Sequence, residues 1–311
     1  MSTEQPIRIA SLLPAATEIV CALGFQDNLV GLSHECDYPN DLASLPVCTK
    51  ALISPDGTSL EIDTAVKNAL KNALSIYHVE DNALRIVKPD VIITQDQCEV
   101  CAVALKDVEA AVCDLLESDA QIVSLNPEDI ENVYKDIERV ADALNVHAKG
   151  AELTQAMQQR LEAICHATEK RETPSVACIE WADPLMAAGN WVPSLVDIAG
   201  GHDLFGQAGL HAPWLDPEKL IAANPDIIVF MPCGFGLERS TQEAQTLMQT
   251  QEWQAIKAVK TDNVYATDGN SFFNRPGPRI VESAEILTEI FFPDMGAPQH
   301  HGTGWVKVAQ L

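Results

Sequence analysis

The fold is decided by a short pattern that occurs twice in the chain: LRIVKPDVIIT at residues 84–94 and LIAANPDIIVF at residues 220–230. In each copy an apolar helical end runs into a Pro-Asp turn, because proline disfavours helix both at its own position and in the residue before it. The apolar run that follows is short, continuous and rich in β-branched residues, which is typical of a strand buried in a parallel sheet. The pattern therefore predicts a helix–turn–strand unit in each half of the chain.

A second repeated pattern lies upstream of each copy. Pro14 begins an apolar stretch that ends at Gly24, and Pro193 begins a similar one that ends at Gly200. Proline at the start and glycine just past the end are the ordinary boundaries of a helix. We therefore predict an α/β fold with two Rossmann-like lobes, each built on a parallel sheet.

The middle of the chain has a different composition. Residues 127–169 contain one glycine, Gly150, have no proline after Pro127, and are rich in Ala, Glu, Gln and Leu. This predicts one long helix or two consecutive helices that join the lobes. The expected domains are an N-terminal lobe at 1–126, a bridging helix at 127–170, a C-terminal lobe at 171–295 and a tail at 296–311.

Composition excludes several classes of partner. The 311 residues are 47% hydrophobic and 21% charged, as in a globular protein, and the net charge is −25. That charge repels nucleic-acid phosphates and anionic lipid surfaces. No apolar run approaches the ~20 residues needed to span a bilayer, so we expect no membrane insertion.

The cysteines and the N-terminus bear on the compartment. Nine cysteines are an odd number, and the first residues carry no positive charge before an apolar stretch that Arg8, Pro14 and Glu18 interrupt. Reduced thiols and a poor secretion signal favour a cytoplasmic protein.

The loops after the predicted strands are rich in polar and reactive side chains. In open parallel sheets ligands bind at the carboxyl ends of the strands, so we expect these loops to face one cleft that closes on a small molecule. The loops lie at residues 33–39, 95–101, 180–184 and 231–234.

The thiols in these loops have two possible uses. Cys98 and Cys101 form a C-x-x-C pair, and Cys36 and Cys233 could complete a site for zinc or iron, with His34 as a further ligand. A redox role is the weaker alternative, since Asp96 and Glu99 oppose a thiolate. The remaining thiols in apolar contexts are expected to be core packing: Cys21, Cys113, Cys165 and Cys178.

Aromatic and basic residues of the second half suit a flat ligand. Trp181 and Trp191 lie in a segment that can form a cleft wall, although packing is the alternative for one of them. A proline-flanked loop contains Phe273 and Arg275, and the arginine could meet a carboxylate or an amide. His300 and His301 are expected to be solvated. The predicted ligand-binding residues are His34, Glu35, Gln95, Glu180, Trp181, Trp191, Phe273 and Arg275.

Several motifs resemble a known family. The segments at 9–18, 33–39, 88–92 and 184–201 are similar to the cobalamin and iron-siderophore periplasmic binding proteins, over nearly the whole chain to about Phe292. The motifs at 33–39, 98–101, 231–235 and 273–279 resemble a subgroup without secretion signals that is labelled cobalamin-binding.

The resemblance implies two lobes bridged by a long helix, with a ligand held between them. Importer-linked members present one glutamate per lobe to the permease. Glu18 matches the first, but Ser194 stands at the second position. Docking to an ABC permease is therefore doubtful on the sequence.

Three hypotheses follow. The first is a cytoplasmic binder of a cobalamin-type corrinoid, in which a neutral His34 could give an axial nitrogen to the metal. The second is a metal or metal-chelate protein that uses the cysteines. The third is a thiol-dependent enzyme acting in the same cleft, although no hydrolase or nucleotide-binding motif supports an enzymatic activity.

Overall fold

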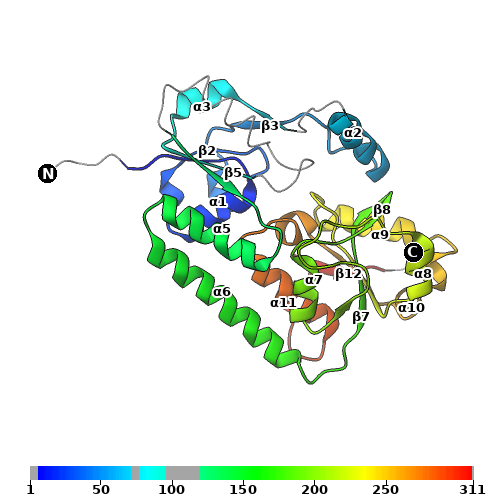
Figure 1. Cartoon of the computed structure of the whole chain (residues 1–311). Coiled ribbons are helices and arrows are strands. Elements are labelled where there is room, and N and C mark those ends of the chain that lie inside the picture. The colour runs from blue at the N-terminus through cyan, green and yellow to red at the C-terminus, as the bar shows by residue number, and fades with distance from the viewer. Residues whose placement is uncertain (1–5, 72–76, 96–119, 310–311) are drawn as a thin grey trace. The chain divides into compact units, whose positions relative to one another are not determined.

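The computed structural model describes residues 6–71, 77–95 and 120–309. The chain divides into two compact units, which are coloured along the sequence in Figure 1. The N-terminal unit contains residues 1–127 and 131–155, and the C-terminal unit contains residues 128–130 and 156–311. The predicted mixed α/β fold with two lobes and parallel sheets is confirmed.

The N-terminal unit is built on a parallel sheet with strand order β2-β1-β5-β6. Its strands are β1 Ile9–Ser11, β2 Leu29–Leu32, β5 Val91–Gln95 and β6 Gln121–Leu125, and its first helices are α1 Pro14–Ala22, α2 Ser59–Lys71 and α3 Asp81–Val87. A separate antiparallel pair is formed by β3 Thr49–Ala51 and β4 Tyr77–Val79.

The C-terminal unit has a six-stranded sheet along the path β12-β11-β10-β7-β8, with β9 paired to β7. Its strands are β7 Ser175–Ala182, β8 Leu185–Ala187, β9 His202–Asp203, β10 Ile227–Phe230, β11 Val264–Thr267 and β12 Trp305–Lys307. Its helices are α7 Val192–Ile198, α8 Pro217–Ala223, α9 Leu237–Met248, α10 Lys257–Lys260 and α11 Ile280–Phe291. The strands β7, β10 and β11 are parallel, and β8 and β12 are antiparallel to their neighbours.

The repeated Pro-Asp turn has the same construction in both units. Lys88 and Asn224, which end α3 and α8, both adopt left-handed backbone conformations, with φ of 43° and 50°. The aspartate carboxylate then accepts the first backbone N–H of the neighbouring strand segment: Asp90 Oδ2 accepts from Arg8 at 2.8 Å, and Asp226 Oδ2 accepts from Ser175 at 2.8 Å. The turn therefore fixes the register of β5 on β1 and of β10 on β7, which explains why it recurs.

We expect Asp226→Asn to lower the free energy of unfolding by about 1–2 kcal/mol, the loss expected for charge-assisted hydrogen bonds that are partly exposed. The Lys257 ammonium and the Ser175 hydroxyl hold the pKa of Asp226 at about 2, below its ordinary 3.8. A lowered folded-state pKa means that this stability is present above pH 4 and decreases as the pH falls from about 4 toward 2.

Urea unfolding followed by tryptophan fluorescence at pH 7 and pH 3 checks this expectation. Lys257→Met is the matched control, since it removes the cation and leaves the Ser175 contacts of the carboxylate. Equal urea midpoints for wild type and Asp226→Asn at pH 7 would contradict it.

The mid-chain segment forms two helices, α5 Ile130–Ala143 and α6 His147–Thr168, rather than one. They are interrupted because Asn145 adopts a left-handed conformation, with φ of 57°. Within the N-terminal unit, Lys149 of α6 donates a hydrogen bond to the Leu23 carbonyl at the end of α1. Within the C-terminal unit, Arg160 of α6 pairs with Glu282 and Glu285 of α11. Each part of α6 is therefore attached to its own unit by a basic side chain.

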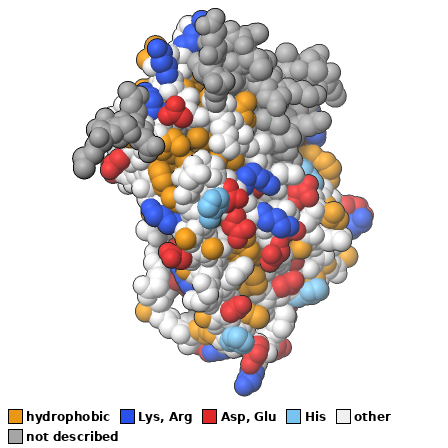
Figure 2. All heavy atoms as spheres, turned by 60° about the vertical axis from the view of Figure 1, so that its left-hand side comes forward, with side chains coloured by type: hydrophobic (Ala, Val, Ile, Leu, Met, Phe, Trp, Pro, Cys, Tyr) orange, Lys and Arg blue, Asp and Glu red, His pale blue; other side chains and the backbone are white. Residues whose placement is uncertain are grey.

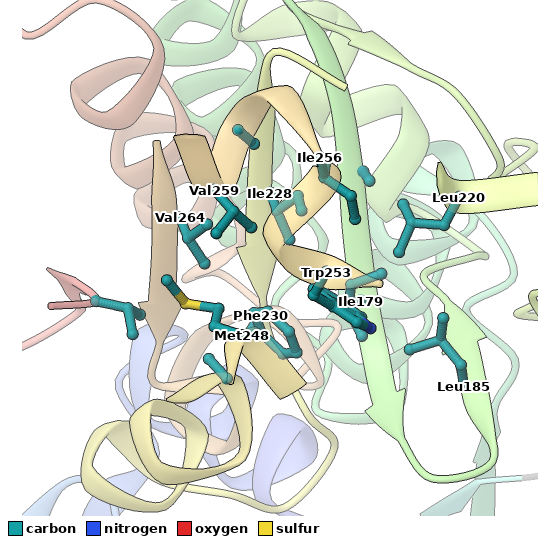
Figure 3. Close-up of a cluster of buried hydrophobic side chains, with 14 of the residues drawn as sticks. Ile179, Leu185, Leu220, Ile228, Phe230, Met248, Trp253, Ile256, Val259 and Val264 are labelled. Carbon is teal, nitrogen blue, oxygen red and sulfur yellow. The ribbon is translucent and has the colours of Figure 1, made fainter. Parts of the chain in front are cut away.

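The core of the C-terminal unit lies between the sheet and helices α9 and α10, as Figure 3 shows. Phe230 at the end of β10 is fully buried, and its ring lies 5.7 Å from the ring of Trp253. Other strand and helix residues complete the cluster: Ile179, Leu185, Leu220, Ile228, Met248, Ile256, Val259 and Val264. The continuous apolar run recognised at residues 227–230 is the central strand β10 of this core.

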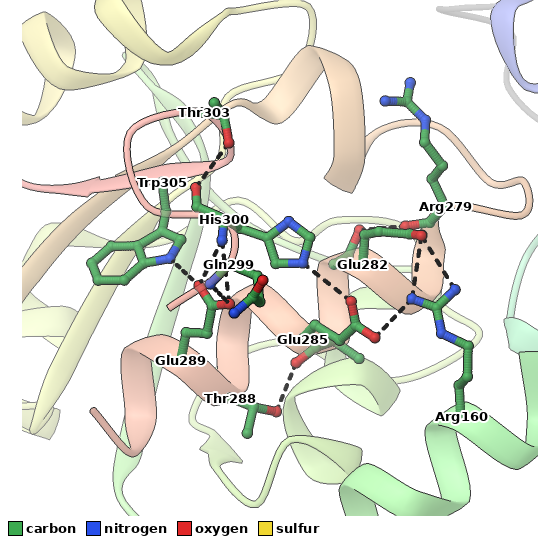
Figure 4. A network of polar contacts seen from close by, with 12 residues as sticks. Arg160, Arg279, Glu282, Glu285, Thr288, Glu289, Gln299, His300, Thr303 and Trp305 are labelled. Atoms are coloured by element: carbon green, nitrogen blue, oxygen red, sulfur yellow. Dashed lines mark hydrogen bonds and ion pairs between the residues drawn. The ribbon is translucent and has the colours of Figure 1, made fainter. Parts of the chain in front are cut away.

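The C-terminal tail is part of the sheet, because β12 pairs antiparallel with β11. The expectation that His300 is solvated is wrong. Its imidazole contacts Glu285 at 3.1 Å, and its backbone N–H donates to Glu289, which also accepts from the indole of Trp305 (Figure 4). The Glu285 contact raises the pKa of His300. These acids of α11 bind the tail through His300, whereas the neighbouring His301 is exposed.

Candidate functional site

A compact group of hydroxyls supports the loop after β2 in the N-terminal unit. Ser33 and Thr49 are buried, at 4% and 2% exposure. The Thr49 hydroxyl donates to Ser33 Oγ at 3.0 Å and accepts from the backbone N–H of His34 at 3.0 Å. The same hydroxyl lies 2.7 Å from His34 Nδ1. Two contacts to one hydroxyl therefore fix both the backbone and the ring of His34.

The two residues predicted to bind ligand in this loop, His34 and Glu35, are both exposed. Tyr77 of β4 connects them: its hydroxyl donates to Glu35 Oε1 at 2.7 Å, and its ring lies 5.2 Å from the imidazole. Partial desolvation lowers the pKa of His34, and the nearby Glu35 carboxylate acts in the opposite direction. The imidazole is therefore neutral at neutral pH.

Cys36, a predicted metal ligand, is half-buried beside α1. Its Sγ lies 3.1 Å from the Thr17 hydroxyl, which donates to Ser11 Oγ at 2.8 Å. Burial raises the pKa of nearby Cys21 to about 11, with Asp41 as the next cause. The Cys21 thiol is therefore fully protonated at neutral pH.

The other cysteines of the described residues are in varied surroundings. Cys178 is buried in β7 as predicted, and this burial raises its pKa. Cys165 is exposed on α6, so its assignment to the core was wrong. Burial also raises the pKa of Cys48 to about 11. These raised pKa values are the opposite of what a nucleophilic thiol requires.

The third N-terminal loop begins at Gln95, the last residue of β5, which is half-buried. The predicted metal ligands Cys98 and Cys101 lie outside the described residues. Within the described ranges, no group of three or more His, Cys, Asp or Glu side chains is arranged to hold a metal ion. The cysteine metal site therefore stays a prediction.

In the C-terminal unit a β-bulge changes the direction of Trp181. Ile179 pairs with Ala187 and Trp181 pairs with Met186, so two residues of β7 are opposite one step of β8. Because a bulge re-aims the side chains that follow it, Trp181 lies on the opposite face of the sheet from Ile179, which is in the core. The bulge thus frees an aromatic ring from the core face.

The face of the sheet that bears Trp181 continues across β8. Met186 pairs with Trp214, and its neighbours Leu185 and Ala187 face the core. Side chains of paired residues share one face of a sheet, so Trp181, Met186 and Trp214 lie side by side on the face away from the core. We call these three residues the Trp–Met–Trp row. Trp181 and Met186 are half-buried and Trp214 is 57% exposed.

The loop after β10 extends the row. The ring of Phe235 lies 5.1 Å from that of Trp181, and the guanidinium of Arg239 lies 3.6 Å above the centre of the Phe235 ring. A cation over an aromatic face is a favourable electrostatic contact. The row therefore ends in a positive charge, which suits a ligand with a flat apolar body and polar or anionic substituents.

Close packing fixes the Phe235 loop. The Met231 and Cys233 N–H groups donate to the Ile179 and Glu180 carbonyls at the end of β7. A Cβ atom on Gly269, in the π-helical turn Gly269–Phe273, would lie 2.3 Å from the Pro232 carbonyl oxygen. Only glycine allows this approach, so the loop after β10 and the π-helical turn pack closely against each other at Gly269.

Three of the predicted ligand-binding residues are buried. Trp191 is 5% exposed and its indole N–H donates to the Phe273 carbonyl at 3.0 Å, while Phe273 is 1% exposed. Trp191 therefore packs in the interior, which was the alternative to a place on a cleft wall. Arg275 is 3% exposed. Glu180 in β7 and Cys233 in the loop after β10 are half-buried.

Sequence reasoning missed several residues of these groups. Thr49 and Tyr77 come from β3 and β4, far from the His34 loop in sequence. Met186, Trp214 and Arg239 meet Trp181 only through pairing and ring contacts between separate segments. One sequence feature could have indicated the aromatic group around Trp181: Trp214 is one of only five tryptophans in the chain.

The sequence of the chain matches a known protein family. Residues 9–270 match the family described as periplasmic binding protein. The chain belongs to this family. The expected resemblance to this family is therefore confirmed.

Similar proteins include several substrate-binding proteins. An uncharacterized ABC transporter substrate-binding lipoprotein, YvrC of Bacillus subtilis, is 24% identical over 298 residues, which cover 94% of this chain and 82% of the relative. A vitamin B12-binding protein of Photorhabdus laumondii is 23% identical over 287 residues, which cover 91% of this chain and 87% of the relative.

Solved structures show the same fold. The periplasmic heme-binding protein RhuT of Roseiflexus sp. RS-1 superposes with a TM-score of 0.69 at 21% identity, covering 93% of this chain and 99% of that chain. The periplasmic vitamin B12-binding protein BtuF of Vibrio cholerae superposes with a TM-score of 0.61 at 19% identity, covering 91% of this chain and 95% of that chain.

Proposed function

We propose that this protein binds a flat metal chelate, of which a cobalamin-type corrinoid is the favoured example. The Trp–Met–Trp row is the observation that carries the proposal. It offers a continuous apolar surface with two aromatic rings beside the carboxyl end of β7, and such surfaces bind the faces of planar ligands. Relatives named as vitamin B12-binding and heme-binding proteins support this class of ligand.

Polar groups near the row would orient the ligand. Arg239 can meet amide or carboxylate substituents at the edge of a macrocycle, since its guanidinium is a planar multiple donor. Glu180 of β7, in the same unit as the row, is a further candidate. The face shown in Figure 2 has basic side chains interspersed with acidic ones. Because the whole chain has a net charge of −25, an anionic substituent would need a local cation such as Arg239.

The proposal is tested by adding diaquocobinamide, cyanocobalamin, hemin and a ferric hydroxamate siderophore separately to the full-length protein. We expect a flat macrocycle to change its visible spectrum on binding and to raise the melting temperature by several degrees at about 100 times its Kd. The siderophore, which lacks a flat ring, is the control. No spectral change and no melting shift with any macrocycle would overturn the proposal.

Delivery to a membrane transporter is part of the same proposal. The relative named as an ABC transporter substrate-binding lipoprotein supports docking to a permease, and gives no support to the doubt drawn from Ser194. No helix in the described ranges has the length and apolar character to cross a bilayer. The cytoplasmic placement stays a prediction, which cell fractionation tests, and the periplasmic and lipoprotein relatives do not support it.

A further inference from the structure

We infer that the end of the chain supports the ligand-binding surface of the C-terminal unit: His300, Gly304 and Trp305 hold the π-helical turn Gly269–Phe273 in place, and ligand affinity is linked to proton uptake by His300. We call these three residues the tail clamp. The inference rests on the proposed function where it concerns affinity, because the turn contacts the loop that bears Phe235. All of these residues belong to one unit.

The tail clamp is attached to helix α11 by two glutamates. Glu289 accepts the backbone N–H of His300 at 3.2 Å and the indole N–H of Trp305 at 2.7 Å, so one carboxylate binds two positions of the tail. Nε2 of His300 lies 3.1 Å from Glu285 Oε2 (Figure 4). Side-chain hydrogen bonds to α11 therefore fix the tail in addition to the pairing of β12 with β11.

The same residues contact the start of the π-helical turn. The backbone N–H of Asp268 donates to the Gly304 carbonyl at 2.9 Å. Asp268 in turn caps the turn, because its carboxylate accepts the backbone N–H of Ser271 at 2.7 Å. The imidazole of His300 meets the ring of Phe272 edge to face, with 6.2 Å between the ring centroids. The tail clamp therefore holds both the capping residue of the turn and an aromatic ring within it.

The turn also contacts the binding surface. The backbone N–H of Asn270 donates to the Phe235 carbonyl at 3.1 Å, and the Phe235 ring is the one that packs on Trp181. A single π-helical turn is a rare element that is frequent at functional sites. A continuous series of contacts therefore leads from the tail clamp to the Trp–Met–Trp row.

His300 lies in a mostly acidic environment. The charged and titratable groups around its imidazole come from four segments: Glu282, Glu285 and Glu289 of α11 with Arg279 at its start, Arg160 of α6, Asp268 before the π-helical turn, and His301 of the tail. The hydrogen bond to Glu285 raises the pKa of His300, whereas partial burial of the ring acts in the opposite direction. The same hydrogen bond lowers the pKa of Glu285.

These two shifts make the clamp tightest in mild acid. Because the pKa of His300 is raised, the protonated ring stabilises the clamp fully below its ordinary value of 6.5, and this stabilisation is lost as the pH rises through the raised value. Because the pKa of Glu285 is lowered, the contribution of its carboxylate is present above the ordinary value of 4.5. We therefore expect the tightest clamp, and the tightest ligand binding, between pH 4.5 and 6.5.

Hydrogen exchange of the ligand-free, full-length protein tests the clamp itself. In His300→Ala, the Asp268 and Asn270 amides should lose at least about threefold of their protection at about pH 6, corrected for intrinsic exchange, because the tail no longer holds the turn. The loss should be smaller at about pH 8.5, where the wild-type ring is less protonated. His300→Gln, which keeps a donor without the charge, should show intermediate protection at about pH 6. His166→Ala, at an exposed histidine of α6, is the matched control and should resemble wild type.

The Ile228 amide of β10, which donates to the Asn263 carbonyl in the core, shows whether each variant is folded. Wild-type protection of Asn270 in a folded His300→Ala would overturn the inference. If that variant does not fold, His300→Gln takes its place, and protection of Asn270 equal to that of wild type at about pH 6 would overturn the inference in the same way.

The link to affinity is tested with diaquocobinamide by titration calorimetry. At about pH 6, His300→Ala should bind at least about threefold more weakly than wild type, the size of effect that a residue outside the binding surface can transmit. The ratio of the two affinities should decrease at about pH 8.5. The ratio is compared because ionisation of the ligand affects both proteins equally. A ratio of one at both pH values would overturn the link.

The two failures are distinguishable. If no macrocycle binds to wild type, the proposed function fails, and the exchange experiment still decides whether the tail clamp holds the turn. If diaquocobinamide binds equally well to wild type and to His300→Ala, the proposed function stands and the role of the tail clamp in binding is overturned.

Discussion

Replacing Trp181 with alanine should weaken the binding of diaquocobinamide by about 30-fold, or about 2 kcal/mol, the loss typical of a central aromatic contact. Trp214→Ala should have an effect of the same order, because both rings belong to the Trp–Met–Trp row. Trp181→Phe should lose much less, since a flat ring remains. Titration calorimetry at one salt concentration measures the three affinities.

The matched control for these variants is Met295→Ala. Met295 is an exposed apolar residue, at 37% exposure, beyond the end of α11 and outside the row. The Met295→Ala variant should bind diaquocobinamide with the wild-type affinity. Wild-type affinity in both Trp181→Ala and Trp214→Ala would show that the ligand does not use this face of the sheet.

Phe230→Ala should lower the free energy of unfolding of the C-terminal unit by about 3–5 kcal/mol. The side chain is fully buried between β7 and Trp253, so truncation removes apolar contacts and leaves a cavity that the surrounding strands cannot close. The loss is large compared with the stability of an ordinary domain.

Tryptophan fluorescence in urea is the suitable measurement, because all five tryptophans lie in the C-terminal unit, at positions 181, 191, 214, 253 and 305. The signal therefore follows one unit even if the two do not unfold together. Phe230→Leu, which keeps most of the volume, should lose less than half as much. A urea midpoint for Phe230→Ala equal to that of wild type would contradict the packing described for this core.

The fold could be predicted because its signals are local. The runs at Val91 and Ile227 are short, apolar and preceded by a Pro-Asp turn, and each forms a central strand. The break between α5 and α6 was left open, because asparagine favours a left-handed conformation only weakly and Asn145 has no proline or glycine beside it. The pairing of β12 with β11 depends on contacts between distant segments and left no local pattern.

The candidate site was predictable only in part. His34 and Glu35 were recognised because the loops after the predicted strands are unusually rich in reactive side chains, and Trp181 because two of the five tryptophans lie within eleven residues. The sequence did not separate Trp181 from Trp191, since the bulge that turns one out and the packing that buries the other are three-dimensional features. Thr49 gave no signal at all, because a buried threonine that orients a histidine has the same local sequence as any strand threonine.

A crystal structure of the full-length protein with diaquocobinamide tests the central claim most directly. The account predicts that one face of the corrin ring lies in van der Waals contact with Trp181, Met186 and Trp214. A corrin ring bound elsewhere on the protein, with these three side chains still open to solvent, would contradict it.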